Sequence, residues 1–106
     1  MCVFCDISSN LDKQSNLIKE GQHVFLIPDK HPVTEGHTLV ITKEHYQDFS
    51  SCSGEALQEA VVLAKEHSLK LQQENPSIQG FNFVSNQGAK AKQVIFHFHL
   101  HIIPRY

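Results

Sequence analysis

The amino-acid sequence predicts an α+β domain in which an antiparallel meander sheet carries one long helix. Three observations predict this class. Strand-like runs lie on both sides of a single helical segment, the connections are short, and strands do not alternate with helices. The chain has 106 residues, the size of one ordinary domain, so we expect a single domain over residues 1–106.

The predicted sheet begins with a hairpin. Residues 16–29 hold two short apolar runs around Gly21, where we expect a tight turn with positive φ. Residues 37–42, HTLVIT, are rich in β-branched side chains and predict the next strand. Two further strands are expected at residues 81–86 and 93–104, with a loop between them.

One helix is predicted between these groups of strands. It begins at an N-cap, Ser53, with Glu55 in the first turn, and ends before Pro76. Side chains expected to face the sheet recur at steps of three and four: Leu57, Ala60, Val61, Ala64, Ser68 and Leu71.

Composition argues against several classes of function. The net charge of -2 is too low for a protein that holds DNA or RNA through a basic surface. No segment approaches the ~20 apolar residues of a membrane span, and the first ten residues do not resemble a secretory signal, so we expect a cytoplasmic protein. Three cysteines, an odd number, predict reduced thiols. The chain has no P-loop or Rossmann motif, and no organic cofactor is expected.

The last predicted strand contains three alternating histidines, His97, His99 and His101. Side chains two apart on a strand lie about 6.5 to 7 Å from one another on one face, so the imidazoles should form a row. The opposite face would then carry Phe96, Phe98, Leu100 and Ile102. The residues alone leave three interpretations: a polar face without function, three ligands of a catalytic metal, or a nucleophilic imidazole with assisting neighbours.

Several stretches together resemble the histidine triad (HIT) family of nucleotide hydrolases and transferases. They are CVFCDI at 2–7, GHTLVITKEH at 36–45, GFNFVSNQG at 80–88 and QVIFHFHLHIIPR at 93–105, which includes the triad pattern HFHLHII. Their order is similar to that of compact prokaryotic-type members. The resemblance implies a HIT-like fold, a homodimer, and cleavage at the α-phosphate of purine nucleoside phosphoramidates or dinucleotides, such as AMP conjugates.

The resemblance also implies which histidines carry the chemistry. His99 corresponds to the nucleophile that forms a nucleotidyl-histidine intermediate, and His101 to the residue that assists the leaving group and contacts the phosphate. His37 corresponds to a fourth active-site histidine. The remaining histidines, His23, His31 and His67, are expected to be surface or packing residues.

The residues implied to bind the nucleotide come from several segments. Asp29 corresponds to the residue that holds the ribose hydroxyls, a task that suits a carboxylate acceptor. Asn86 and Gln93 correspond to amides near the phosphate, and the full implied set is Asp29, Asn86, Gln93, His99 and His101. The chain departs from the family pattern at Lys92, where Gly is usual, and at Val94, where several members have Ser or Thr.

A Cys-x-x-Cys pair, Cys2 and Cys5, is by itself compatible with a metal site, a redox pair or two unrelated residues. The resemblance implies that His45 and His97 complete a structural zinc site with this pair. Zinc would then tie the N-terminus to the triad strand and support folding. His97 would be structural, which leaves His99 and His101 for the phosphate.

Two alternative functions remain open. One is a metal-dependent phosphohydrolase that uses the triad as metal ligands, and the other is a nucleotide-binding regulatory module with little turnover. The leaving group is not identified. Because the chain ends at Tyr106, without the extra C-terminal segment that many members place over the partner's active site, we expect broad specificity.

Overall fold

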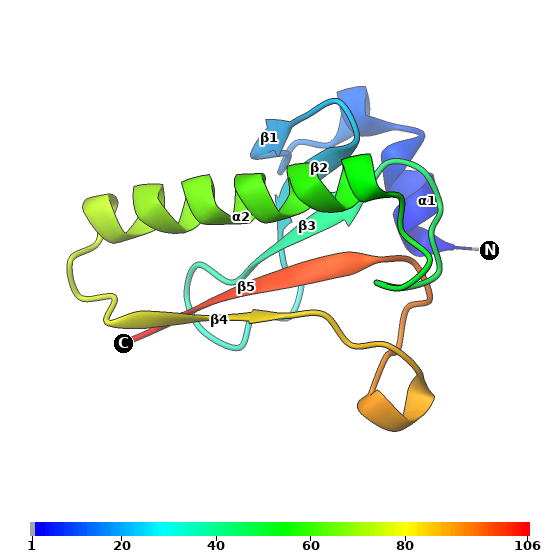
Figure 1. The fold of residues 1–106 in the computed structure, drawn as a ribbon. Helices are drawn as coiled ribbons and strands as arrows, with labels where there is room; N and C mark the ends of the chain where they lie inside the picture. Colours follow the sequence, from blue (N-terminus) through cyan, green and yellow to red (C-terminus); the bar gives the residue numbers. More distant parts are fainter. Residues whose placement is uncertain (1) are drawn as a thin grey trace.

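The structure, a computed structural model, describes residues 2–106; Met1, which the predicted domain includes, lies outside the described residues. Its elements in chain order are α1 (Val3–Ser8), η1 (Leu11–Lys13), β1 (Lys19–Glu20), β2 (Val24–Pro28), β3 (Thr38–Thr42), α2 (Gly54–Glu74), β4 (Gly80–Val84), η2 (Ala89–Ala91) and β5 (His99–Arg105). The strands form one sheet in the order β1-β2-β3-β5-β4, and every neighbouring pair is antiparallel. Figure 1 shows α2 lying along one face of this sheet. The predicted α+β class with one long helix is therefore confirmed.

Helix α2 begins as predicted. The Ser53 side chain accepts a hydrogen bond from the Ala56 backbone N–H at 3.2 Å, which satisfies one of the unpaired donors of the first turn. The expected inward position of Val61 is wrong, because this side chain is 55% exposed. The helix packs instead through a stripe of mostly small side chains: Ala56, Ala60, Leu63, Ala64, His67 and Ser68.

The sheet has a separate apolar core on each face. On the α2 side, Val24, Leu26, Val40, Phe98 and Ile102 pack against the helix. On the opposite side, Phe25, Ile27, Leu39 and Ile41 pack with Phe4 of α1. Successive side chains of β2 and β3 thus point alternately into the two cores, which explains why these central strands are buried along most of their length.

The predicted strand at residues 93–104 begins too early. The chain bends at residues 95–97, and β5 starts only at His99. Phe96 is consequently 42% exposed and does not share the core with Phe98. The cause is tertiary: the Gln93 side chain donates to the carbonyl oxygens of Gln47 and Ile95, which holds this segment in a loop despite its strand-like composition.

The hairpin around Gly21 is confirmed, but the reason for the glycine differs from the prediction. Strands β1 and β2 pair antiparallel, and the Gly21 N–H donates to the Val24 carbonyl at 2.8 Å. Gly21 has no positive φ; a Cβ atom here would collide with the Glu59 carboxylate. That carboxylate accepts hydrogen bonds from the backbone N–H groups of His23 and Val24, so Gly21 provides room for a contact between α2 and the hairpin.

No helix within residues 2–106 combines the length and the apolar character that crossing a lipid bilayer would require.

Candidate active site and metal centre

A pocket of about 840 Å³ lies on the face of the sheet opposite α2. Six residues that the sequence analysis assigned to chemistry or nucleotide binding line it: Asp29, His37, Asn86, Gln93, His99 and His101. Its volume falls in the range of small-molecule sites. The structure thus brings these residues together, although they come from widely separated parts of the chain.

Strand register explains this convergence. His99 and His101 lie two apart on β5 and so face the same side of the sheet. In the β3–β5 ladder Thr38 pairs with Ile102, which places His37 beside the triad strand. Asp29 follows β2 directly, and its N–H donates to the His37 carbonyl at 3.0 Å.

A hydrogen-bond chain determines the tautomer of His101. The Val33 backbone N–H donates to His37 Nδ1 at 3.0 Å, so the proton of a neutral His37 is on Nε2. This Nε2 lies 2.9 Å from His101 Nδ1 and 3.3 Å from the Asp29 carboxylate. His101 Nδ1 therefore accepts from His37, and His101 carries its own proton on Nε2.

His99 has the opposite tautomer. Its Nδ1 lies 2.7 Å from the backbone carbonyl oxygen of His97, which can only accept, so Nδ1 carries the proton. The Nε2 lone pair of His99 is consequently free. Two imidazoles on one strand face, with ring centroids 5.1 Å apart, thus offer a nucleophilic nitrogen and an N–H donor.

Burial keeps these imidazoles neutral. Burial lowers the pKa of His37 and of His99, with the Asp29 charge opposing the shift in both. Burial, followed by the neighbouring imidazoles of His99 and His37, lowers the pKa of His101 to about 4. At pH 7 a neutral imidazole is a competent nucleophile without a separate base.

Four candidate metal ligands meet at the other end of the triad segment. The Cys2 thiol lies 3.2 Å from His97 Nδ1, and the Cys5 thiol lies 3.2 Å from His45 Nδ1. All four ligand atoms are within 4.8 Å of one another. Two sulfurs and two nitrogens are a donor set that tetrahedral zinc takes. The cluster is therefore compatible with zinc.

The fully buried His97 is oriented for metal binding by strand β3. Its Nε2 donates to the Thr42 carbonyl at 2.7 Å, which leaves the Nδ1 lone pair directed at the two thiols. Such a second hydrogen bond is typical of a metal-ligating imidazole. Its carbonyl oxygen also accepts from His99 Nδ1, so His97 links the candidate metal site to a residue of the pocket.

Comparisons with known proteins decide the family. The protein-family model described as the HIT domain matches residues 10–106. The chain belongs to the HIT family. An uncharacterized HIT-like protein of Mycoplasma genitalium is 50% identical to it, and the alignment covers 99% of this chain and 73% of that protein.

Solved structures of HIT proteins have the same fold. A hypothetical histidine triad nucleotide-binding protein from Sulfolobus tokodaii aligns with a TM-score of 0.88 and 36% identity, covering 99% of this chain and 69% of that one. A Zn-bound histidine triad family protein from Mycobacterium smegmatis aligns with a TM-score of 0.89 and 34% identity, covering 99% and 75% of the two chains. The HIT-like fold predicted from the sequence is therefore confirmed.

The triad of this HIT protein does not converge on one metal position. Within residues 2–106, one group of candidate ligands contains His97 with the two cysteines and His45, and the other contains Asp29, His37 and His101. His99 belongs to neither group. The interpretation of the triad as three ligands of one ion therefore lacks support in the geometry.

The loop before β5 in this HIT protein has an unexpected backbone. Lys92, where the family pattern has glycine, adopts the left-handed conformation with φ 68° and ψ 27°. A non-glycine residue there costs on the order of 1 kcal/mol, which explains why glycine is usual at this position. Gln93 stabilises the turn, because its side-chain oxygen accepts from the Gly88 N–H at 2.8 Å. Both residues line the pocket together with Asn86, whose amide donates to the Lys92 carbonyl at 3.4 Å.

Sequence reasoning missed the groups that orient the histidines. The Val33 N–H, the Thr42 carbonyl and the His97 carbonyl are backbone atoms, and no residue type signals them. Phe4 was also missed; its ring edge packs against His99 with centroids 5.0 Å apart. Its place between the two cysteines in CVFC was the available signal.

The low pKa of His101 predicts acid destabilisation of this HIT protein. The unfolded chain protonates this imidazole near pH 6.5 and the folded chain near 4, so between these values the unfolded state binds more protons. The contribution of His101 to the stability of the folded chain is therefore fully present above pH 6.5 and is lost as the pH falls toward 4. Between pH 7 and 4, protonation of His101 should lower the free energy of unfolding of the wild-type chain by on the order of 2 to 3 kcal/mol. We expect His101→Gln to lack this decrease.

Urea unfolding of both proteins at pH 7, 5 and 4 measures this difference. Metal release on acidification affects both proteins, so the difference between their pH slopes reports His101. Identical slopes would contradict the prediction.

Proposed function

We propose that this HIT protein is a nucleotide hydrolase or nucleotidyl transferase that acts at the α-phosphate of purine nucleoside phosphoramidates or dinucleotides. The observation that carries the proposal is the pair of opposite tautomers on β5. His99 offers a lone pair on Nε2, and His101 offers a proton on Nε2, in one pocket. The hypothetical histidine triad nucleotide-binding protein from Sulfolobus tokodaii, which is similar over nearly the whole chain, also supports it.

In the proposed first step, His99 Nε2 attacks the α-phosphorus. The new P–N bond forms as the bond from phosphorus to the leaving group breaks, and the leaving group takes up a proton that reaches it from solvent through the His101 Nε2–H. The His101 N–H hydrogen-bonds the leaving atom or a phosphoryl oxygen. The His97 carbonyl accepts from His99 Nδ1 and so stabilises the positive charge that the ring gains on attack.

In the second step, water or another acceptor attacks the same phosphorus. The P–N bond breaks, the electron pair returns to His99 Nε2, the attacking water or acceptor gives its proton to solvent, and AMP or a transferred nucleotide is released. His99 is then restored, and a neutral imidazole again faces the pocket. The choice of acceptor decides between hydrolysis and transfer.

The remaining pocket residues support a nucleotide as the substrate. Phe4, Ile27 and Leu39 give an apolar wall suited to a purine base, and Lys30 and Lys92 supply positive charge for phosphates. We assign Asp29 to the ribose hydroxyls, which a carboxylate can accept from. Asn86 and Gln93 complete the phosphate side.

The proposal includes structural zinc at Cys2, Cys5, His45 and His97. The donor set and the Zn-bound relative from Mycobacterium smegmatis support it. We also propose a cytoplasmic location, which three cysteines that form no disulfide with one another support.

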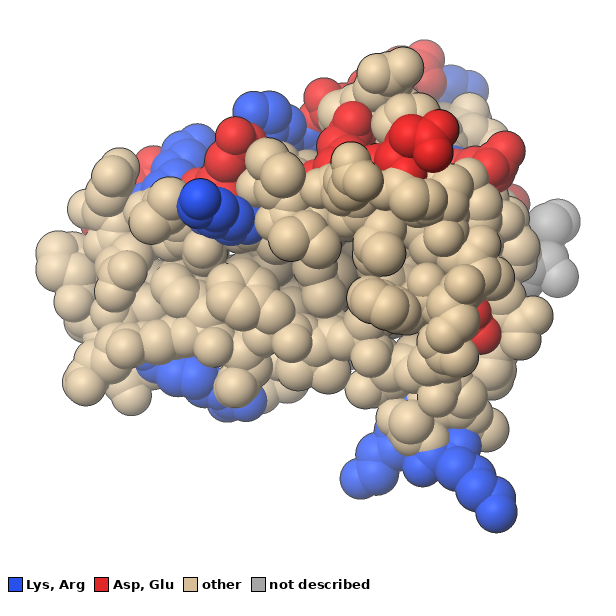
Figure 2. Space-filling model, in the orientation of Figure 1, with Lys and Arg blue, Asp and Glu red and all other residues tan. Residues whose placement is uncertain are grey.

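A homodimer is also part of the proposal. Apolar side chains lie exposed on α2 and on the edge strand β4, among them Val61, Val62, Leu69 and Phe83. Figure 2 shows a broad, largely uncharged face over these two elements, with charged side chains gathered around its borders. Exposed apolar surface of this kind marks interaction sites. Sedimentation equilibrium should give twice the chain mass, and a monomer at all concentrations would contradict the homodimer.

A substrate comparison tests the function. The full chain is incubated with adenosine 5′-phosphoramidate and, separately, with a diadenosine polyphosphate, and release of AMP is measured. We expect AMP from at least one of them. The absence of AMP together with tight AMP binding would favour the regulatory module instead.

Chelation separates the proposal from a metal-water mechanism, for which Asp29, His37 and His101 are the available ligands in the pocket. Chelation with EDTA is limited to conditions in which metal analysis shows that the Cys2 site retains its zinc. Turnover that survives this treatment supports nucleophilic catalysis by His99, and its loss supports the metallohydrolase.

A further inference from the structure

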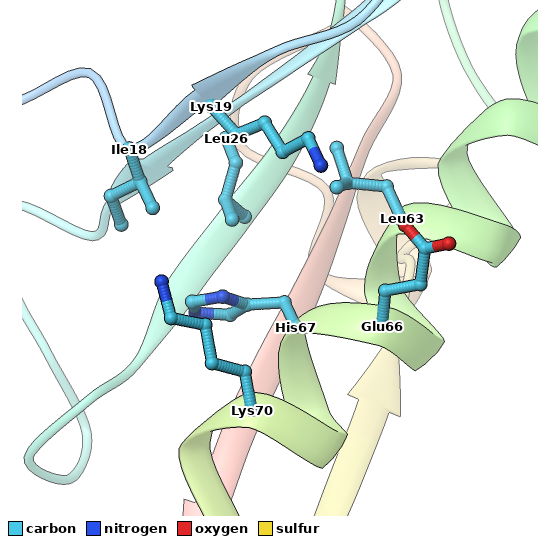
Figure 3. A pocket seen from close by; sticks show the side chains of 7 residues that line it. All are labelled: Ile18, Lys19, Leu26, Leu63, Glu66, His67 and Lys70. Atoms are coloured by element: carbon cyan, nitrogen blue, oxygen red, sulfur yellow. The ribbon is translucent and has the colours of Figure 1, made fainter. Parts of the chain in front are cut away.

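A second pocket, of about 120 Å³, lies on the opposite face of the sheet from the triad, between α2 and the β1–β2 hairpin. Figure 3 shows the side chains that line it. They come from two elements: Ile18, Lys19 and Leu26 from the hairpin region, and Leu63, Glu66, His67 and Lys70 from α2.

His67 is the unusual residue of this pocket. Its side chain projects from α2 toward the hairpin (Figure 3). The residue is only 8% exposed, and its Nε2 is buried without a hydrogen-bond partner among residues 2–106. Unpaired buried nitrogens are rare in native proteins, so a ligand with a polar atom that hydrogen-bonds to Nε2 is a physical explanation for this one.

The charges around His67 define the kind of ligand. Burial and the Lys70 charge lower the pKa of His67, against the opposing Glu74 charge, so the imidazole is neutral. Two ammonium groups, Lys19 and Lys70, then face one carboxylate, Glu66. The residues that line the pocket therefore carry one net positive charge, since Glu74 is not among them, and this charge matches a monoanion better than a dianion.

The apolar side chains define the rest of the ligand. Leu26 is 1% exposed and Leu63 is 6% exposed, and both belong to the core on the α2 side of the sheet. A phosphate ion would place polar oxygens against these leucines, which is unfavourable. A short hydrocarbon group would instead bury apolar surface there. As for size, an apolar cavity of about 150 Å³ accommodates benzene, so this one suits a ligand of about six non-hydrogen atoms.

We propose that this pocket binds a small monocarboxylate. The carboxylate accepts hydrogen bonds from His67 Nε2–H and from the ammonium groups of Lys19 and Lys70. The hydrocarbon part packs on Leu26 and Leu63. The site lies across the sheet from His99 and does not depend on the proposed nucleotide chemistry.

Nuclear magnetic resonance of the His67 ring tests the proposal, with butyrate as the probe. The full chain is titrated with sodium butyrate at constant ionic strength. We expect a saturable shift of the His67 ring signals with a dissociation constant in the millimolar range. Parallel titrations with 1-butanol, which lacks the charge, and with inorganic phosphate, which lacks the hydrocarbon, should give no saturable shift.

Variants of the two lysines show whether the shift reports this pocket. Lys19 and Lys70 are exposed, so Lys19→Gln and Lys70→Gln should retain the fold. Each should weaken butyrate binding about tenfold, because each removes a charge-assisted hydrogen bond. The matched control is Lys65→Gln, an exposed position on α2 that does not line the pocket, which should leave the dissociation constant unchanged.

A thermal measurement provides an independent readout. Butyrate should raise the melting temperature of the wild-type chain and of Lys65→Gln, and should not raise that of a Lys19→Gln/Lys70→Gln double variant. The proposal is overturned if butyrate gives no saturable shift or if butanol binds equally well. Tighter binding of phosphate than of butyrate, or unchanged affinity in the lysine variants, would also overturn it.

Discussion

Replacing His99 with alanine should abolish a covalent nucleotidyl adduct and lower turnover of an AMP conjugate by about 10⁴-fold. The reason is specific to this imidazole. Among the histidines of residues 2–106, only His99 has its Nδ1 proton held by a backbone carbonyl while its Nε2 lone pair faces the pocket, so His101 cannot take over its role without changing tautomer. The measurement is intact-protein mass spectrometry after brief incubation with an AMP donor labelled at the α-phosphate.

Two further variants make this result interpretable. His23→Gln is the matched control, because this histidine is contacted through its backbone rather than its ring, and label and turnover should both persist. In His101→Gln the nucleophile is intact, so we expect slower labelling rather than none. Label that persists in His99→Ala would contradict the assignment of the nucleophile, whatever the turnover.

The sequence predicted those features of the site that depend on the identity and spacing of side chains. The alternation from His97 to His101 predicted a row of imidazoles, and the family resemblance separated His97 from its neighbours. The structure does place His97 with Cys2, Cys5 and His45 and the other two in the pocket. The roles of these residues stay predictions. Their tautomers were beyond sequence reasoning, because backbone atoms determine them.

The fold shows the same limit of local patterns. The class and the N-cap Ser53 follow from composition, spacing and turn residues, and they are correct. The start of β5 is wrong because Gln93 holds a loop through a contact with Gln47, which lies 46 residues earlier in the chain. Val61 is exposed because the packing of α2 on the sheet, rather than spacing alone, selects the buried stripe. Long-range contacts therefore account for both errors.

Loss of the candidate zinc should have the largest effect on stability. We expect Cys5→Ser to lose bound zinc and to lower the melting temperature by about 15 °C or more. This value follows because a ligand at about 1,000 times its dissociation constant adds about 4 kcal/mol to the stability of the folded state. Differential scanning calorimetry and metal analysis of the purified protein measure the two effects.

The third cysteine provides the matched control. Cys52 is a free thiol outside the cluster, so Cys52→Ser should keep one zinc per chain and nearly the wild-type melting temperature. The assignment of the ligands would be contradicted if Cys5→Ser retained a full equivalent of zinc or had the melting temperature of the wild type.

Loss of metal from the Cys2, Cys5, His45 and His97 cluster should also affect the pocket. The four ligands join α1, the segment after β3 and the bend before β5, and Cys2 and His97 are 95 residues apart. Without metal, His97 loses a constraint on its backbone, and its carbonyl is the acceptor that orients His99. Cys5→Ser should therefore also slow adduct formation at temperatures where the chain remains folded. In Cys52→Ser the labelling rate should be unchanged, which distinguishes loss of orientation from a general effect of removing a thiol.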